Sequence, residues 1–237
     1  MALYLGNNKV SLNSGYTTTS GMKAYFNAGG KCRSSSATNF TNIIHYDDTS
    51  DLTSMDDMFM DCVRLTTIPL IDTSKVTNMG RMFYNCDELT SVPLFDTSKV
   101  TDMSEMFTGC VKLTTIPLFN TSKVTSMSYM FQTCDRLSII PALDVSNVDS
   151  MTDMFKMCSK LREIHMTGMK VSFDISASTL FTREALIEIF NNLATVTTTK
   201  YLTIGNTNVE KLTAIDFAIA EDKGWRVVGD KLWQTQN

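Results

Sequence analysis

Apolar residues recur through the middle of the chain with a fixed period of 24 positions. Met-Phe pairs, single cysteines and single prolines all keep this period. The pairs begin at Met58, Met82, Met106, Met130 and Met154, the cysteines are Cys62, Cys86, Cys110, Cys134 and Cys158, and the prolines are Pro69, Pro93, Pro117 and Pro141. A fixed period of this length indicates a solenoid, in which each unit buries its apolar edge against the next.

Two apolar patterns alternate within each unit. The first has spacings of three and four, typical of one buried helix face, at Val76, Met79, Met82, Phe83, Cys86 and Leu89. The second fits a short strand, with Val92 and Leu94 pointing inward, and such strands would stack about 4.8 Å apart. The sequence therefore predicts an α/β repeat with short parallel strands on one side and short helical arms on the other.

The two ends of the chain depart from this period. We expect residues 1–38 to form a polar N-terminal cap or attachment segment, with a hairpin within residues 4–10 and a short helix around 22–28. The repeats occupy residues 39–175. Longer capping repeats follow over residues 176–237, because the exposed apolar end of a stack needs a cover.

The pattern of this C-terminal part predicts four elements. An amphipathic helix spans residues 182–193, with Thr182 as its N-cap. A strand over 201–204 follows, then a second helix over about 209–222 and a last strand over 225–228.

The repeat motif resembles that of the BspA-like leucine-rich-repeat family of bacterial surface proteins. Those units carry Asp-Thr-Ser-x-Val-Thr-x-Met and Met-Phe-x-x-Cys-x-x-Leu-Thr, which read here as Asp96 to Met103 and Met106 to Thr114. The resemblance covers about residues 41 to 166. It implies a leucine-rich-repeat-like solenoid with a non-enzymatic role in recognition or adhesion.

The N-terminal stretch from Tyr4 to Val10 is similar to segments of tail-associated phage proteins. The first residues also lack the basic and apolar regions of a secretory signal. Both features favour a virion protein or a bacterial cell-surface protein that is delivered without such a signal. The alternative is that this stretch only caps the first repeat.

Charge and composition argue against nucleic-acid binding and against insertion into a membrane. The chain has 21 basic and 25 acidic side chains, giving a net charge of -4, so no basic footprint for a polyanion exists. No run approaches the roughly 20 apolar residues of a membrane span.

The motifs for catalysis are missing. His45 and His165 lie 120 residues apart, and the sequence has neither a nucleophile elbow nor a phosphate-binding loop. We expect no enzyme activity, no catalytic residue and no cofactor.

The periodic cysteines, methionines and aspartates each allow more than one interpretation. The five periodic cysteines could bind zinc, form disulfides or remain buried thiols, and their apolar phase favours thiols. The methionines could bind a soft metal or pack in the core, where their phase places them. Asp72, Asp96 and Asp144 could bind calcium or cap helices, and capping explains them without an ion. We therefore expect no metal site.

The strand side is the predicted binding surface. If Val92 and Leu94 point inward, Pro93 and Phe95 point outward, and the same holds in neighbouring units. The predicted site residues are His45, Pro69, Ile71, Pro93, Phe95, Pro117, Phe119, Pro141 and His165. The competing interpretation is that the chain bends after each proline and buries Phe95 and its equivalents, since proline rarely lies within a central strand.

These observations predict a recognition or attachment protein that binds a host-cell-surface glycan or protein. The alternative is a structural subunit whose apolar row packs on neighbouring virion or envelope subunits.

Overall fold

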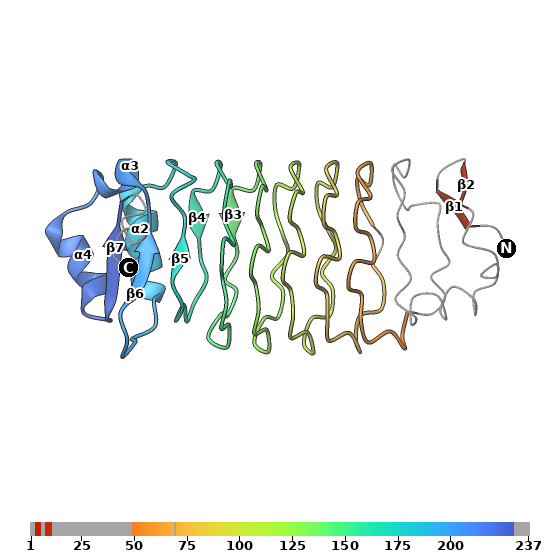
Figure 1. Ribbon diagram of the computed structural model, residues 1–237, viewed down its shortest axis with the longest axis horizontal. Coiled ribbons are helices and arrows are strands. Elements are labelled where there is room, and N and C mark those ends of the chain that lie inside the picture. The colour runs from red at the N-terminus through yellow and green to blue at the C-terminus, as the bar shows by residue number, and fades with distance from the viewer. Residues whose placement is uncertain (1–2, 6–7, 11–48, 69, 230–237) are drawn as a thin grey trace, which may run out of the picture.

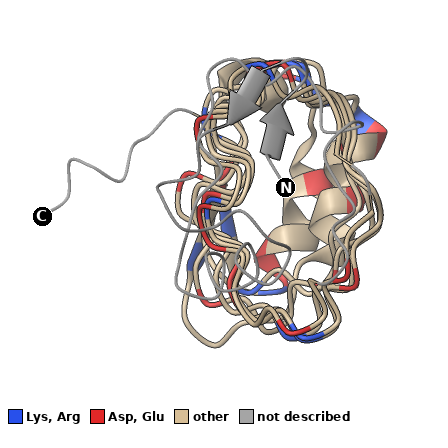
Figure 2. Ribbon diagram, turned by 90° about the vertical axis from the view of Figure 1, so that its right-hand side faces the viewer, with Lys and Arg blue, Asp and Glu red and all other residues tan. Residues whose placement is uncertain are grey.

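The computed structural model is a row of stacked coils and describes residues 3–5, 8–10, 49–68 and 70–229 (Figure 1). Viewed end-on, the successive coils superpose (Figure 2). Strand β1 (Leu3–Leu5) pairs antiparallel with β2 (Asn8–Val10), which confirms the expected hairpin. The predicted helix around 22–28 lies outside the described residues, as do His45 and Pro69.

The 24-residue period of the sequence is the period of the stack. Parallel bridges join equivalent backbone positions of consecutive coils, at Ser54, Asn78, Asp102, Ser126 and Ser150. Phenylalanine rings also pile in register, with centroids 5.4 to 6.0 Å apart and nearly parallel planes, at Phe59, Phe83, Phe107, Phe131 and Phe155. Each ring is buried, so the interior of the stack is a continuous apolar column.

The arm expected to be helical is built from successive turns instead. Residues 49–68 and 70–181 contain no helix, so the prediction of helical arms is wrong for these coils. The predicted inward set is nevertheless right, since Val76, Met79, Met82 and Cys86 are all fully buried. Spacings of three and four therefore identified the buried face but not the backbone conformation.

The hydrogen bonds explain why turns replace the helix. The amide of Arg81 donates to the carbonyl of Ser104 in the next coil, and the amide of Phe83 donates to Met106. The amide of Tyr84, which lies between such positions, donates to Arg81 within its own turn. In an α-helix all these amides would donate along the helix axis. Here about half of them donate to a neighbouring coil instead, so the hydrogen bonds join the coils.

This alternation needs residues with positive φ at two places in each turn series. One such slot holds Asp61, Asn85, Gly109, Thr133 and Met157, with φ between 55° and 76°. A residue with positive φ has a left-handed backbone conformation, which ends any right-handed helical run after a single turn.

The strand side shows why regular strands are rare in the repeats. Strands β3 (Ile139–Ile140) and β4 (Glu163–Ile164) pair in parallel. The next residue, His165, occupies the slot that holds proline in earlier coils, and its amide donates to the carbonyl of Ile140 at 3.0 Å. Proline has no amide hydrogen, so Pro93, Pro117 and Pro141 cannot make this bond.

The C-terminal coils are larger and carry helices. Helix α2 (Arg183–Asn192) begins after Thr182, whose side chain accepts a hydrogen bond from the amide of Ala185, so the predicted N-cap is confirmed. Three parallel strands follow one another in the order β5 (Phe173–Asp174), β6 (Lys200–Thr203) and β7 (Trp225–Val228).

The helix expected over about 209–222 begins later than predicted, and a separate short helix precedes it. Helix α3 (Asn206–Val209) is short, and α4 (Ala214–Glu221) starts anew at Thr213. Thr213 and Asp216 form a reciprocal capping box, which marks a second helix start. Within the described ranges, no helix is both long and apolar enough to cross a membrane.

Candidate recognition surface

The aromatic row predicted to face outward is buried. Phe95 and Phe119 are each 2% exposed, and Ile71 is 5% exposed. The two rings stack on one another at 6.3 Å and contact the central phenylalanine column, with Phe83 6.2 Å from Phe95. The expectation that these side chains point outward is therefore wrong, and their burial agrees with the competing interpretation.

A tight turn at the proline accounts for the reversal. The amide of Phe119 donates to the carbonyl of Pro117 at 3.0 Å, two residues back, and Leu143 makes the same bond to Pro141 at 2.7 Å. In such a γ-turn the middle residue lies at the apex and points outward. Leu118 is that middle residue, so the alternation of a strand shifts by one position and turns Phe119 inward.

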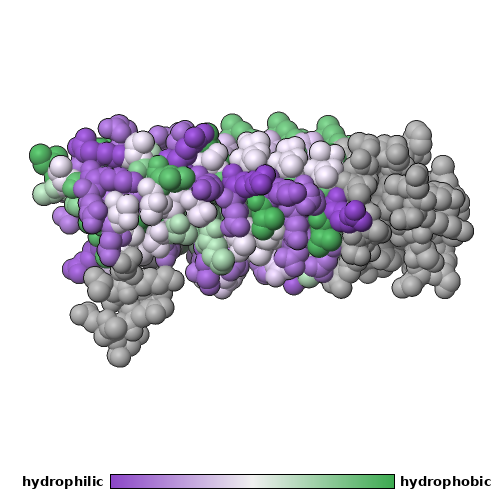
Figure 3. Space-filling model, turned by 90° about the horizontal axis from the view of Figure 1, so that it is seen from above, coloured by the Kyte–Doolittle hydropathy of each residue, from purple (hydrophilic) through white to green (hydrophobic). Residues whose placement is uncertain are grey.

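Leu94, which the sequence placed inside, is at the surface, whereas Val92 is buried as predicted. Leu70, Leu94 and Leu118 are 68%, 59% and 58% exposed, and they occupy equivalent positions in three consecutive coils. We call these three residues the leucine row. From above, the surface of the stack is largely polar or of intermediate hydropathy, with apolar side chains at separate points along it (Figure 3). The signal that could have revealed the row is the spacing of three between the inward residues Val92 and Phe95.

The other predicted members of the site have different positions. Pro93, Pro117 and Pro141 are half-buried beside the leucine row. His165 is also half-buried, with Nδ1 2.6 Å from Oε1 of Glu188. The structure therefore brings the described prolines and His165 to the same slot of successive coils, and His165 also contacts Glu188 of helix α2.

Charged side chains lie next to the leucine row. Asp72 and Asp96 are exposed, and each accepts a hydrogen bond from the amide two residues ahead, at Ser74 and Ser98. Hydrogen bonds from the backbone and side chain of Ser74 lower the pKa of Asp72, and hydrogen bonds from the side chain and backbone of Ser98 lower the pKa of Asp96. Both aspartates form turns rather than helix caps, and they stay ionised at neutral pH.

The periodic cysteines are buried thiols. The Sγ atoms of Cys86, Cys110 and Cys134 lie within 3.2 Å of a phenylalanine carbonyl in the preceding coil. Burial raises the pKa of these three thiols well above the ordinary value, and it raises the pKa of Cys158 to about 12. The prediction that the periodic cysteines are buried thiols is confirmed for Cys62, Cys86, Cys110, Cys134 and Cys158.

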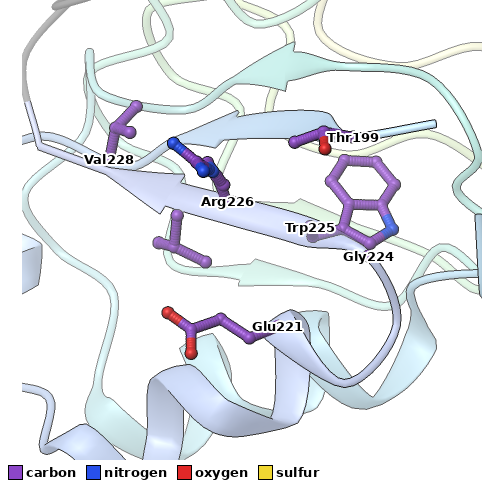
Figure 4. Close-up of a pocket in the computed structure, with 7 residues that line it drawn as sticks. Thr199, Glu221, Gly224, Trp225, Arg226 and Val228 are labelled. Carbon is purple, nitrogen blue, oxygen red and sulfur yellow. The ribbon is translucent and has the colours of Figure 1, made fainter.

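Two further features bear on ligands. In the described part of the chain, no group of three His, Cys, Asp or Glu side chains is arranged to hold a metal ion. A groove of about 490 Å³ follows strand β7 near the end of helix α4 (Figure 4). It is distant in sequence from the leucine row and is lined mainly by β7.

Comparison with known proteins relates the repeats to one family and one fold. The family described as "Mycoplasma protein of unknown function, DUF285" matches residues 33–114, 53–167 and 87–195, overlapping segments that together span more than half of the chain. The crystal structure of a leucine-rich-repeat protein from T. pallidum, TpLRR, is similar with a TM-score of 0.50 and 14% sequence identity, over 74% of this chain and 78% of that one. No curated protein sequence matches the chain.

Proposed function

The chain belongs to the DUF285 family and has a leucine-rich-repeat type of fold, and from this premise we propose that it is a non-enzymatic recognition protein. In this proposal the stack is a solenoid that presents the leucine row to a partner protein at a bacterial or host-cell surface. The observation that carries the proposal is the exposure of Leu70, Leu94 and Leu118 at the same position of three consecutive coils, since exposed apolar side chains gathered along one edge are typical of partner sites.

The chemistry of this surface favours a protein over a glycan as the partner. Sugar recognition commonly uses exposed aromatic faces, and the aromatic side chains of this edge, Phe95 and Phe119, are buried. Leucine side chains offer apolar contact without hydrogen bonds. Ionised Asp72 and Asp96 beside them provide a polar rim, which is the usual arrangement of a protein interface.

A second candidate function is assembly. The same row could pack on a neighbouring subunit of a virion or cell envelope, because interfaces between subunits also bury apolar side chains. Location in a virion or at a bacterial surface remains part of the proposal in both cases.

Binding of the labelled full chain to intact bacterial cells tests the first function. We expect binding that is lost after protease treatment of the cells and weakened at least about tenfold by Leu94→Asp with Leu118→Asp, since burial of each leucine contributes about 1.5 to 3 kcal/mol. The matched control is Met157→Asp, because Met157 is 56% exposed but lies in a different slot of the coil.

Three outcomes decide between the candidates. Equal binding by the leucine variant and wild type would contradict a role for the row. Protease-resistant binding together with a glycan-array signal would show a sugar ligand. Loss of self-association in the leucine variant, without any binding to cells, would favour the assembly function.

A further inference from the structure

Strand β7 forms one edge of the three-stranded parallel sheet. It pairs with β6 on one side, in the register Lys200 to Trp225 through Thr203 to Val228. Among the strands that the structure describes, none pairs with its other side. The groove of about 490 Å³ follows this outer side, lined by Thr199, Glu221, Gly224, Trp225, Arg226, Val227 and Val228 (Figure 4).

The backbone groups that face this groove can be identified from the pairing with β6. The amide of Lys200 donates to the carbonyl of Gly224 at 3.3 Å, and the amide of Ile204 donates to Val228 at 2.9 Å. Successive residues of a strand direct their amide and carbonyl groups to opposite edges. Because positions 224 and 228 face β6, the amide and carbonyl groups of Trp225 and Val227 face the groove.

The backbone groups along this strand edge determine what kind of partner can bind there. Alternating amide and carbonyl groups are matched by another extended polypeptide backbone, and a strand edge of this kind is a template for pairing. Proteins usually block such edges with proline, lysine or a bulge. β7 has none of these along Trp225–Val228, and its single charge is Arg226.

The sequence of the edge is compatible with a second copy of itself. When two β7 strands pair antiparallel with Val227 opposite Val227, the groove-facing amides and carbonyls of both strands meet. Arg226 then lies opposite Val228 of the second copy, so the two guanidinium groups are not directly paired. Exposed Glu221 supplies a negative charge beside the same groove, so two copies bring both signs to the contact.

We propose that the outer edge of β7 pairs antiparallel with β7 of a second copy, giving a two-fold symmetric dimer through the C-terminal end of the stack. This surface is separate from the leucine row, and the dimer does not depend on the function proposed for that row. A symmetric dimer would present two stacks that extend in opposite directions from their joined C-terminal ends.

Sedimentation equilibrium of the full chain, up to millimolar concentration, tests the proposal. We expect wild type to approach twice the monomer mass, whereas Val227→Pro stays monomeric because it removes an amide on the outer side only. The control Val227→Thr keeps that amide and a β-branched side chain, and it should dimerise like wild type. Far-UV circular dichroism checks that Val227→Pro remains folded.

Hydrogen exchange supplies a second measurement that does not depend on the proline variant. In wild type, exchange at the amides of Trp225 and Val227 should slow with increasing concentration, while exchange at Leu94 should not change. A monomeric wild type at every concentration would overturn the proposal. A dimer that survives Val227→Pro, or that shows no added protection at Val227, would place the contact elsewhere and overturn it equally.

Discussion

The Nδ1 atom of His165 lies 2.6 Å from Oε1 of Glu188, so a polar contact joins the last short coil to helix α2. Nε2 of the same ring lies 3.3 Å from Oε2 of Glu163, whose other oxygen is 3.9 Å from Nε of Arg162. The hydrogen bond with Glu188 is the main cause that raises the pKa of His165, and Glu163 raises it further. The protonated ring can donate to both carboxylates at once.

This contact predicts a dependence of stability on pH. Because the folded-state pKa of His165 is raised above the ordinary value of about 6.5, its contribution is complete below that value and is lost as pH rises through the folded-state pKa. The side chain is 33% exposed, so we expect a loss of at most about 1 kcal/mol. Urea unfolding midpoints of wild type and His165→Gln across this pH range measure it.

The variant comparison isolates His165 from other titrating groups. His165→Gln should lack the decline of stability that wild type shows with rising pH. Glu163→Gln keeps the contact with Glu188 and should retain most of that decline. Identical pH profiles for wild type and His165→Gln would contradict the assignment.

Truncation of the neighbouring residues Leu118 and Phe119 should change the free energy of unfolding by very different amounts. Phe119→Ala removes a buried ring from the stacked column and should lower the free energy of unfolding by about 3 to 5 kcal/mol. Leu118→Ala removes an exposed side chain and should change it by no more than about 0.5 kcal/mol. Chemical denaturation of both variants checks the reversed orientation, and equal losses would argue against it.

The cysteine row should resist alkylation while the protein is folded. Burial raises the pKa of Cys86, Cys110 and Cys134, so their nucleophilic thiolate form is scarce at neutral pH. In a Cys32→Ser background, mass spectrometry after iodoacetamide treatment should show no added groups on folded protein. After unfolding in urea the five buried cysteines should all react. Rapid modification of the folded chain would show that the row is accessible.

Gly109 should tolerate asparagine better than alanine. Its φ is +76°, and an added Cβ would lie 2.5 Å from Oδ1 of Asn85 in the preceding coil. Gly109→Ala should therefore destabilise the fold by about 1 kcal/mol or more. Gly109→Asn should cost less, because asparagine adopts positive φ more readily and occupies this slot at Asn85. Thermal denaturation of the two variants tests this order, and the reverse order would contradict it.

Much of the architecture was accessible from the sequence because it depends on periodicity. The spacing of the Met-Phe pairs and cysteines predicted the in-register column of phenylalanines and the buried thiols. The capping pattern at Thr182 predicted the C-terminal helix, and the Trp225 to Val228 stretch, rich in aromatic and β-branched residues, predicted the last strand. Each of these features follows from local chemistry repeated along the chain, or from which side chains avoid water.

The orientation of the strand-side residues was decided by the tertiary structure. Leu118 and Phe119 are both apolar and adjacent, so hydrophobicity alone could not tell which one points inward. Likewise, Val76 to Leu89 has the spacing of a helix face, yet amides such as those of Arg81 and Phe83 bond to the next coil. In both places, hydrogen bonds set the backbone conformation, either between coils or across the turn at proline. Such bonds depend on neighbours in space, and a periodic pattern of side chains does not specify them.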